Sequence, residues 1–234
     1  MSSSNFKGTL ILSVAVIFLG IMLPVAVKQY RSFDRVVSVK GLCEQEVKAD
    51  KAIWPITYKV VSNDLADLTA RIDKGQKAIV DFLKAGGIEE SEITFSAPLI
   101  SDKLSQEYGN NDRAFRYISR NTLTVCTQKV DKVQELSCKI YELMKKGVLI
   151  GNENRWESDV QYYFEGLNDI KPEMIQQATA NARVAAEQFA KDSGSKIGKI
   201  KTASQGTFSI EPRDSNTPQI KRIRVVTNVT YTLN

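Results

Sequence analysis

The stretch WPITYKVVSNDLADLTARIDKGQKAIVDFLKAGG, residues 54–87, contains the two patterns that decide the fold class. Its first residues alternate between apolar and other side chains, which is typical of a strand with one buried face. The residues on the apolar face are Trp54, Ile56, Tyr58 and Val60. Pro55 cannot donate a hydrogen bond to a neighbouring strand, so it indicates a sheet edge or a bulge.

The rest of this stretch predicts an amphipathic helix. Apolar residues recur at spacings of three, four and seven, so they form one stripe along a helix. The stripe consists of Leu65, Leu68, Ile72, Ile79, Val80 and Leu83. Asn63 or Asp64 is the expected N-cap residue, and Gly86-Gly87 is expected to end the helix.

Further strands flank this strand–helix pair. On the amino-terminal side, Val36-Val37-Ser38-Val39-Lys40-Gly41 predicts the start of a strand. On the other side, residues 93–99 alternate, a polar loop covers 101–112, and 115–127 predicts a long strand. Consecutive strands usually lie side by side, so 93–99 and 115–127 are expected to form an antiparallel hairpin.

The second half of the chain adds two helices and three strands. A helix is predicted from Val130 to Leu143, stopped by Gly147, and a strand from 156 to 164. Pro172 suits the first turn of a further helix, which Gly194 is expected to close. The expected buried face of that helix holds Ile175, Ala178, Ala182, Ala185 and Phe189.

The chain ends in a second predicted hairpin, formed by residues 196–210 and 219–233. Alternate residues of its last strand share a face: Ile223, Val225, Thr227, Val229, Tyr231 and Leu233. The predicted element order is therefore β-α-β-β-α-β-α-β-β. Antiparallel hairpins separated by single helices indicate an α+β fold in which the helices pack on the sheet.

An uncharged segment precedes this domain. Residues 8–27 read GTLILSVAVIFLGIMLPVAV and lie between Lys7 and Lys28. About 20 apolar residues in a helix cross a hydrocarbon core roughly 30 Å thick, so the segment is a predicted transmembrane helix. The expected organisation is an N-terminal cytoplasmic stub and membrane anchor over residues 1–29, followed by the α+β domain over 30–234.

Cleavage and orientation of this segment are separate questions. The segment ends without a good small-x-small cleavage site, which favours an uncleaved anchor over a cleaved secretory signal. More basic residues follow the span than precede it, a count that would keep the domain in the cytoplasm under the positive-inside rule. Those residues are Lys28, Arg31 and Arg35 after the span and Lys7 before it. The layout is equally that of an N-terminal export signal, which would place the domain outside.

The distribution of charge along the chain argues against a nucleic-acid partner. The net charge is +5, and the densest basic cluster is Lys221, Arg222 and Arg224. A solvated strand edge explains this cluster, because Lys and Arg discourage edge-to-edge pairing. A nucleic-acid surface usually needs a basic stripe with aromatic partners, so no nucleic-acid partner is expected.

The three cysteines, Cys43, Cys126 and Cys138, show no CxxC spacing, which argues against zinc and thioredoxin-type sites. Cys126, on a predicted strand, and Cys138, on a predicted helix, are expected to be small buried hydrophobes. One disulfide is possible in an oxidising compartment, and the sequence does not choose the pair.

The chain contains no histidine, which removes the commonest general base and the commonest metal ligand. The carboxylate pairs Glu89-Glu90 and Glu44 with Glu46 fit solvated positions, and an acidic strip on a strand face is the alternative for the second pair. The segment 194–199, GSKIGK, is shorter than a phosphate loop and leads out of a helix, so it predicts a turn. No catalytic, cofactor-binding or metal-binding residue is predicted, and the protein is not expected to be an enzyme.

Three stretches carry a family resemblance. They are 36–41 followed by Trp54-Pro55, then 117–125 running into 130–133, and the block from Ala178 to Ile200. Together with the closing strand around Val225, they resemble the SIMPL-domain family, which includes bacterial periplasmic immunogenic proteins. The resemblance spans about residues 36–233 and rests on the order and spacing of the motifs.

The resemblance implies an α+β domain, export to the bacterial cell envelope and homo-oligomer formation, with no catalytic residues to carry over. The chain departs from the family where Ile56 follows Pro55, a position that is often acidic, and in its anchor-like front end. We therefore expect a single-pass inner-membrane protein that assembles through a periplasmic domain, with a structural or stress-protective role. The alternative is an envelope binding module for a small ligand or a cell-wall or lipid component.

Overall fold

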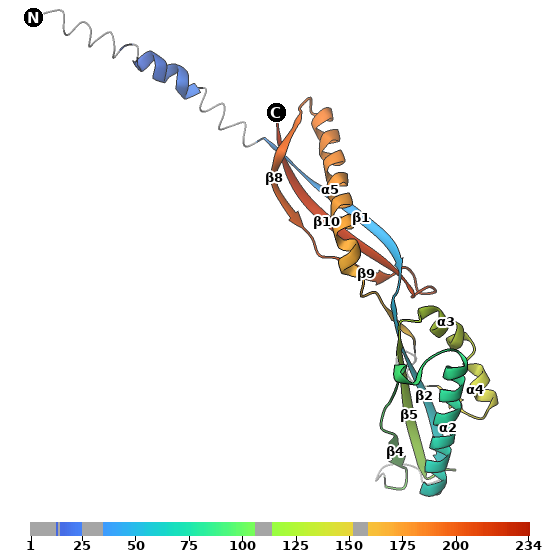
Figure 1. Cartoon of the computed structure of the whole chain (residues 1–234). Helices are drawn as coiled ribbons and strands as arrows, with labels where there is room; N and C mark the ends of the chain where they lie inside the picture. Colours follow the sequence, from blue (N-terminus) through green and yellow to red (C-terminus); the bar gives the residue numbers. More distant parts are fainter. Residues whose placement is uncertain (1–12, 14, 25–34, 106–113, 152–158) are drawn as a thin grey trace, which may run out of the picture. The chain divides into compact units, whose positions relative to one another are not determined.

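The computed structural model describes residues 13, 15–24, 35–105, 114–151 and 159–234. The chain divides into two compact units. Unit 1 comprises the residues up to Gln45, Asp169–Ser209 and Ile223–Asn234, and unit 2 comprises Glu46–Asn168 and Ile210–Arg222. Figure 1 labels most of the helices and strands of both units. The α+β prediction is confirmed, but the strands form two sheets where one was expected.

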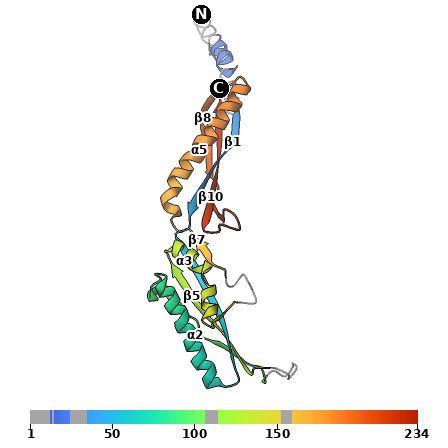
Figure 2. The same cartoon turned by 90° about the vertical axis from the view of Figure 1, so that its right-hand side faces the viewer.

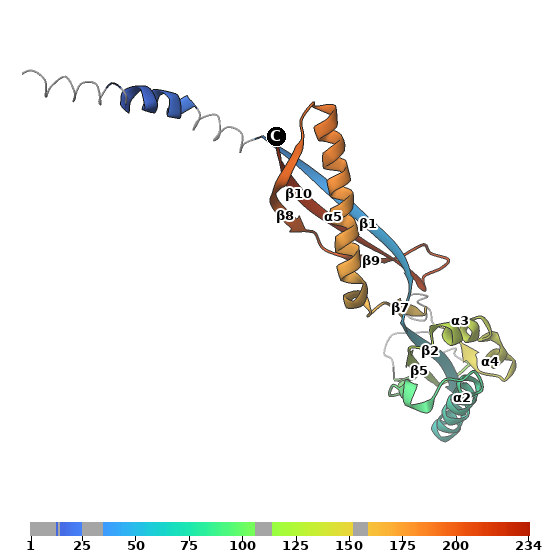
Figure 3. The same cartoon turned by 45° about the horizontal axis from the view of Figure 1, so that its top comes forward.

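The sheet that belongs mainly to unit 1 has the strand order β1-β10-β8, with β9 also paired to β10. Its strands are β1 (Val36–Lys48), β8 (Ile197–Gln205), β9 (Ser209–Pro212) and β10 (Ile220–Leu233). β10 pairs with β8 antiparallel, which confirms the second predicted hairpin. One helix, α5 (Leu167–Asp192), lies along β1 and β10 in both Figure 2 and Figure 3.

The core of unit 1 is small and tightly packed. Val39 of β1 and Val229 and Tyr231 of β10 contact Ala182 and Ala186 of α5. Alternate residues of β10 face this helix, so the apolar face predicted for the last strand is confirmed from 223 to 231.

The backbones of α5 and β1 approach each other closely at Gly41. A Cβ atom at Gly41 would lie 1.8 Å from the carbonyl oxygen of Ala178 and 2.6 Å from the backbone nitrogen of Ala182. Asn181 Nδ2 also donates to the Leu42 carbonyl oxygen at 2.8 Å. A side chain at position 41 would therefore collide with the backbone of α5, so this contact requires glycine on the strand.

Unit 2 is built on a six-stranded antiparallel sheet with the order β3-β5-β2-β6, in which β4 pairs with β5 and β7 with β2. The strands are β2 (Lys51–Ser62), β3 (Ile93–Phe95), β4 (Leu99–Asp102), β5 (Tyr117–Thr127), β6 (Leu149–Ile150) and β7 (Gln161–Tyr163). β3 and β4 both pair antiparallel with β5, which confirms the first predicted hairpin. Pro55 lies between the segments of β2 that pair with β6 and β7, so its strand is unpaired on that side, and the predicted sheet-edge position is confirmed.

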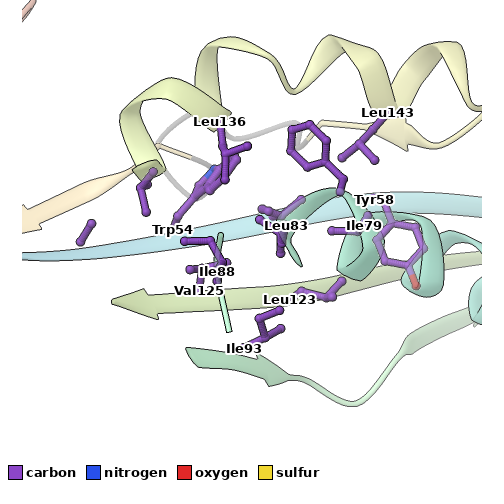
Figure 4. Close-up of a cluster of buried hydrophobic side chains, with 14 of the residues drawn as sticks. Trp54, Tyr58, Ile79, Leu83, Ile88, Ile93, Leu123, Val125, Leu136 and Leu143 are labelled. Atoms are coloured by element: carbon purple, nitrogen blue, oxygen red, sulfur yellow. The ribbon is translucent and has the colours of Figure 1, made fainter. Parts of the chain in front are cut away.

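The helices of unit 2 pack on one face of this sheet. They are α2 (Leu65–Ala85), the 3-10 turn η1 (Glu90–Glu92), α3 (Val130–Cys138) and α4 (Tyr141–Lys145). Figure 4 shows the core between them, where Trp54 and Tyr58 of β2 and Leu123 of β5 meet Leu83 of α2 and Leu143 of α4. Each of these side chains is at most 2% exposed.

The start of α2 and the ends of α2, α4 and α5 follow the predicted signals. The Asp64 side chain accepts a hydrogen bond from the Asp67 backbone N–H at 2.8 Å, which identifies Asp64 as the N-cap residue of α2. Gly87, Gly147 and Gly194 have φ values of 90°, 83° and 67° and end α2, α4 and α5. Residues with a side chain rarely adopt these angles, so glycine is the residue that allows each turn. The prediction of a helix stop and a turn holds at Gly194, whereas residues 197–199 of the segment already belong to β8.

Several predicted elements differ from the structure. The strands expected over 93–99 and 196–210 are each interrupted, into β3 and β4 and into β8 and β9. The strand expected to continue from 36–41 into 54–61 is interrupted at Ala49 and Asp50, and its two parts, β1 and β2, join different sheets. The helix expected over 130–143 breaks into α3 and α4 at Lys139 and Ile140. The helix α5 begins five residues before Pro172, which therefore lies inside it.

The buried face of α5 is also displaced from the predicted one. Its buried residues recur every four positions: Met174, Ala178, Ala182, Ala186 and Ala190. Ala178 and Ala182 were predicted correctly, whereas Phe189 is 61% exposed. The row of alanines is buried and Phe189 is not, because the close approach of α5 to β1 at Gly41 leaves room only for small side chains.

The cysteines are free, and two of them are more accessible than predicted. Cys126 and Cys138 are exposed, and Cys43 is half-buried. Val125 and Thr127 face the helices, so Cys126 lies on the opposite face of β5. Cys138 falls outside the stripe that α3 buries. The expectation that both are buried is wrong.

The basic cluster near the end of the chain does not lie on a strand edge. β10 has neighbours on both sides, and Lys221 is only 7% exposed. Burial lowers the pKa of the Lys221 ammonium group. The edge interpretation of Lys221, Arg222 and Arg224 is therefore wrong, because their strand pairs in the middle of its sheet.

Part of the predicted membrane anchor lies outside the described residues. Of the segment 8–27, the structure describes residue 13 and residues 15–24, which are helical. Within the described part of the chain, we find no helix with the length and hydrophobicity that a membrane crossing requires. Trp156, which was placed on a predicted strand, also lies outside the described residues.

Candidate functional site

Unit 2 contains a cavity of about 590 Å³ between α2, β2 and the turn that leads from α4 into β6. Small-molecule sites usually have volumes of about 300–1,000 Å³. The lining combines apolar residues with four basic ones. The apolar and aromatic residues are Tyr58, Val60, Val61, Ala78, Val148 and Leu149, and the basic residues are Lys59, Arg71, Lys74 and Lys146. We call this cavity the basic cleft.

Tyr58 forms the buried wall of the basic cleft. Its side chain is 1% exposed, and its hydroxyl donates to the Ile72 carbonyl oxygen at 3.0 Å. Gly75 on the next turn of α2 leaves room for the ring, since a Cβ atom there would lie 2.8 Å from Tyr58 Cε2. The ring is therefore held rigidly between β2 and α2.

The charges around the cleft are only partly balanced. Arg71 Nε pairs with Asp67 Oδ2 at 2.8 Å. The Ser62 hydroxyl donates to Asp67 at 2.6 Å and, together with Arg71, lowers the pKa of that carboxyl group. Within the described part of the chain, no ion pair involves Lys74 or Lys146. Two positive charges therefore remain at the rim without a carboxylate partner.

Tyr58 gives unit 2 an expected pH dependence. Burial, with a smaller contribution from the charge of Asp73, raises the pKa of Tyr58 to about 12, from an ordinary value of 10. A group whose pKa is raised by folding stabilises the fold below the unfolded pKa, and this stability is lost as the pH rises from 10 towards 12. A rise of this size in the pKa of Tyr58 corresponds to about 2–3 kcal/mol in the free energy of unfolding.

We expect the free energy of unfolding of the full chain, measured by urea unfolding with circular dichroism, to show this loss between pH 10 and 12. Tyr58→Phe removes the titrating group, so its alkaline loss should be smaller, at a cost of about 1 kcal/mol at neutral pH for the missing hydrogen bond. Tyr141→Phe, at a position 51% exposed, is the matched control. Equal alkaline losses in Tyr58→Phe and the unmutated chain would contradict this assignment.

A second groove, of about 440 Å³, lies in unit 1 between α5 and the edge strand β8. Its lining includes Arg183 of α5, Ile200 of β8 and Tyr231 of β10. Large apolar side chains are exposed on the same two elements: Val184 at 65%, Phe189 at 61% and Ile200 at 51%. Apolar groups exposed on a folded domain often mark a contact surface.

A third cavity, of about 450 Å³ in unit 2, is lined by groups that neutralise one another. Arg213 lies 3.4 Å from Glu46 and 3.1 Å from Asp214, and Lys48 pairs with Asp131. Because its charges are already paired, this cavity offers a weaker site for a charged ligand than the basic cleft.

The acidic pairs seen in the sequence do not form a site. Glu44 pairs with Arg224 at 3.5 Å, and Glu46 lies 3.9 Å from Arg222, so the acidic residues of β1 face the basic residues of β10. Glu89 and Glu90 pair with Lys129 and Lys84, respectively. Within the described residues, no group of three Cys, Asp or Glu side chains is arranged to hold a metal ion.

The residues of the basic cleft were missed in the sequence because they come from separate elements. Lys59 and Arg71 lie on different elements, Lys146 is more than seventy positions further along the chain, and the three show no motif. The one local signal is Arg71 and Lys74, three positions apart on a helix, which places both on neighbouring turns of one face. Only the packing of α2 against β2 and α4 brings them to one cavity.

Comparison with known proteins identifies the family. The family model described as "SIMPL: Protein of unknown function (DUF541)" matches residues 37–231. The chain belongs to the SIMPL family. The match covers nearly all of the chain from β1 to β10, so the SIMPL domain of this protein includes the basic cleft and the α5–β8 groove. The predicted resemblance is confirmed.

The other comparisons add little. A solved structure, described as a hydrolase from Listeria innocua, is similar over 82% of this chain and 91% of its own, with 11% identity. Its TM-score of 0.23 is too low to carry an argument about fold or activity. No curated protein matches the chain.

Proposed function

We propose that this SIMPL-domain protein is a single-pass protein of the bacterial inner membrane whose domain lies in the periplasm and assembles with further copies. Its proposed role is structural or stress-protective and not catalytic. The proposed membrane anchor is supported by a cluster of exposed apolar side chains on the N-terminal helix. They are Val16, Ile17, Phe18, Leu19, Ile21, Met22 and Leu23, each between 49% and 65% exposed.

A bilayer would remove this apolar surface from water. Burying one large apolar side chain contributes about 1.5–3 kcal/mol, so seven of them provide a strong preference for hydrocarbon. The uncharged sequence continues on both sides of the described helix, from residue 8 to residue 27. An uncleaved anchor would hold the SIMPL domain at the membrane surface.

Support for assembly comes from the exposed apolar residues of unit 1. Val184 and Phe189 are exposed on α5, and Ile200 of β8 is exposed at the groove between these two elements. The exposed side of α5 carries both signs of charge, as in the Arg183–Glu187 pair at 2.9 Å. A second copy of the chain would therefore meet neither a purely positive nor a purely negative surface, and the shared membrane would raise its local concentration.

One experiment on spheroplasts tests both parts of this proposal. Externally added protease is expected to digest the SIMPL domain of the full chain while the membrane stays intact, and a short cross-linker that joins carboxylate groups is expected to give dimers or larger species. Val184→Lys places a charge in the proposed contact and should reduce cross-linking at least about fivefold, since burying an unpaired charge is costly.

Gln176→Lys is the matched control, because it adds the same charge to α5 at another exposed position. Protection of the domain from external protease would contradict the periplasmic location. Cross-linked species that are absent, or equally abundant in Val184→Lys and the unmutated chain, would contradict assembly through this surface.

The alternative function, an envelope binding module, is favoured by a different observation. The basic cleft of unit 2 combines a ligand-sized volume, an apolar wall and two lysines without ion-pair partners in the described chain. Binding at this cleft is compatible with assembly through unit 1, because the two surfaces share no residue.

A further inference from the structure

We infer that the basic cleft of unit 2 binds a phosphomonoester that carries an apolar substituent. This inference rests on the binding-module alternative and not on assembly. It assigns the chemical class of the ligand and the residues that recognise each part of it.

The positive charge of the cleft fits a doubly charged head group. Asp67 already pairs with Arg71 at 2.8 Å, so these two charges largely cancel. Lys74 on α2 and Lys146 after α4 both line the cavity, are exposed and have no ion-pair partner in the described chain. A phosphomonoester carries about −1.5 to −2 charges at pH 7, which two ammonium groups would balance.

The apolar part of the cleft fits a hydrocarbon substituent. Val60 of β2, Ala78 of α2 and Val148 line the same cavity, and Leu149 at its mouth is 62% exposed. An inorganic anion would leave this surface in water, whereas an alkyl chain would cover it. Because each buried CH₂ contributes about 0.8 kcal/mol, a substituent of several carbons should bind far more tightly than phosphate alone.

The cleft is also held in shape before any ligand arrives. Tyr58 is fixed by its hydrogen bond to the Ile72 carbonyl oxygen and by the absence of a side chain at Gly75. The Val148 backbone N–H donates to the Leu143 carbonyl oxygen at 3.0 Å, which fixes the turn that follows Lys146. A preformed site loses less conformational entropy on binding than a flexible one.

The test is calorimetric titration of the full chain, held in phosphatidylcholine nanodiscs, with hexyl phosphate. Hexanol and inorganic phosphate, which each lack one half of this probe, are the matched ligands. We expect hexyl phosphate to bind and both partial ligands to bind at least about tenfold more weakly, because each loses one group of contacts. No binding of hexyl phosphate, or equal binding of hexanol, would overturn the inference.

Variants locate the binding. Lys74→Gln and Lys146→Gln should each weaken hexyl phosphate about tenfold, the effect of losing one charge-assisted contact. Lys77→Gln removes a charge from the same helix outside the cleft and should change the affinity less than twofold. Equal losses in all three variants, with unchanged melting temperatures, would show a nonspecific charge effect and overturn the assignment.

Titration in a second set of nanodiscs, which contain phosphatidate, distinguishes a lipid head group from a soluble ester as the natural ligand. A weaker apparent affinity for hexyl phosphate in these nanodiscs would identify a lipid head group as the occupant, and an unchanged affinity would identify a soluble ester. Binding that persists in Val184→Lys separates this inference from assembly, since either can fail without the other.

Discussion

Gly41→Ala is expected to destabilise unit 1 by about 3 kcal/mol, at the upper end of the usual cost of overpacking a core. The added methyl group would lie 1.8 Å from the Ala178 carbonyl oxygen and 2.8 Å from the Ala182 Cβ atom. Part of this contact is backbone, which cannot move aside as a flexible side chain does. The α5 helix as a whole would have to shift away from β1.

Gly41→Ala is expected to destabilise the protein, whereas the same substitution elsewhere in a strand would stabilise it. In a strand without such a contact, replacing glycine by alanine stabilises by roughly 0.5–1 kcal/mol, because glycine loses more conformational freedom on folding. Faster hydrogen exchange in α5, β1 and β10 of the variant would therefore report the steric contact directly. Lys40→Ala, at the adjacent exposed position, is the control and should leave exchange nearly unchanged. Slower exchange in Gly41→Ala would mean that α5 does not pack against β1 at this point.

Leu83→Ala is expected to destabilise unit 2 by about 2–5 kcal/mol, the range for truncating a buried leucine. Leu83 is fully buried and packs in the core that joins α2 to the sheet (Figure 4). Its removal loses apolar burial and leaves a cavity that the rigid sheet can only partly close. Faster hydrogen exchange in α2, β2 and β5 is the expected readout.

Leu65→Ala is the matched control on the same helix. Leu65 belongs to the same predicted stripe, but it is 51% exposed at the first residue of α2. The substitution should therefore cost less than about 1 kcal/mol. Similar losses for Leu65→Ala and Leu83→Ala would indicate that α2 buries a different face from the one described.

Much of the local structure was predictable because its causes are local. Asp64 caps α2 through its own side chain, and Gly87 ends it through a φ value that other residues rarely adopt. Both hairpins were predicted, because alternation of apolar residues and short connections are properties of adjacent segments. The family assignment also followed from the order and spacing of such elements.

The errors share one origin, which is that burial depends on what a segment meets. Phe189 is a better apolar anchor than Ala186 by hydrophobicity alone, yet Ala186 is buried and Phe189 is exposed. The close contact of α5 with β1 at Gly41 decides this, and the contact joins residues more than one hundred positions apart. Cys126 and Lys221 were misplaced in the same way, because the neighbours of β5 and β10 are remote in sequence.

The sequence by itself determined the α+β class, the helix ends, the hairpins and the uncharged segment 8–27, since each depends on residues within one or two turns or strands of one another. Tertiary structure alone decided the division into two sheets, the buried face of α5 and the convergence of Lys74 and Lys146 on one cavity with Tyr58. The physical reason is that backbone preferences are local, whereas packing and charge balance depend on contacts between distant segments.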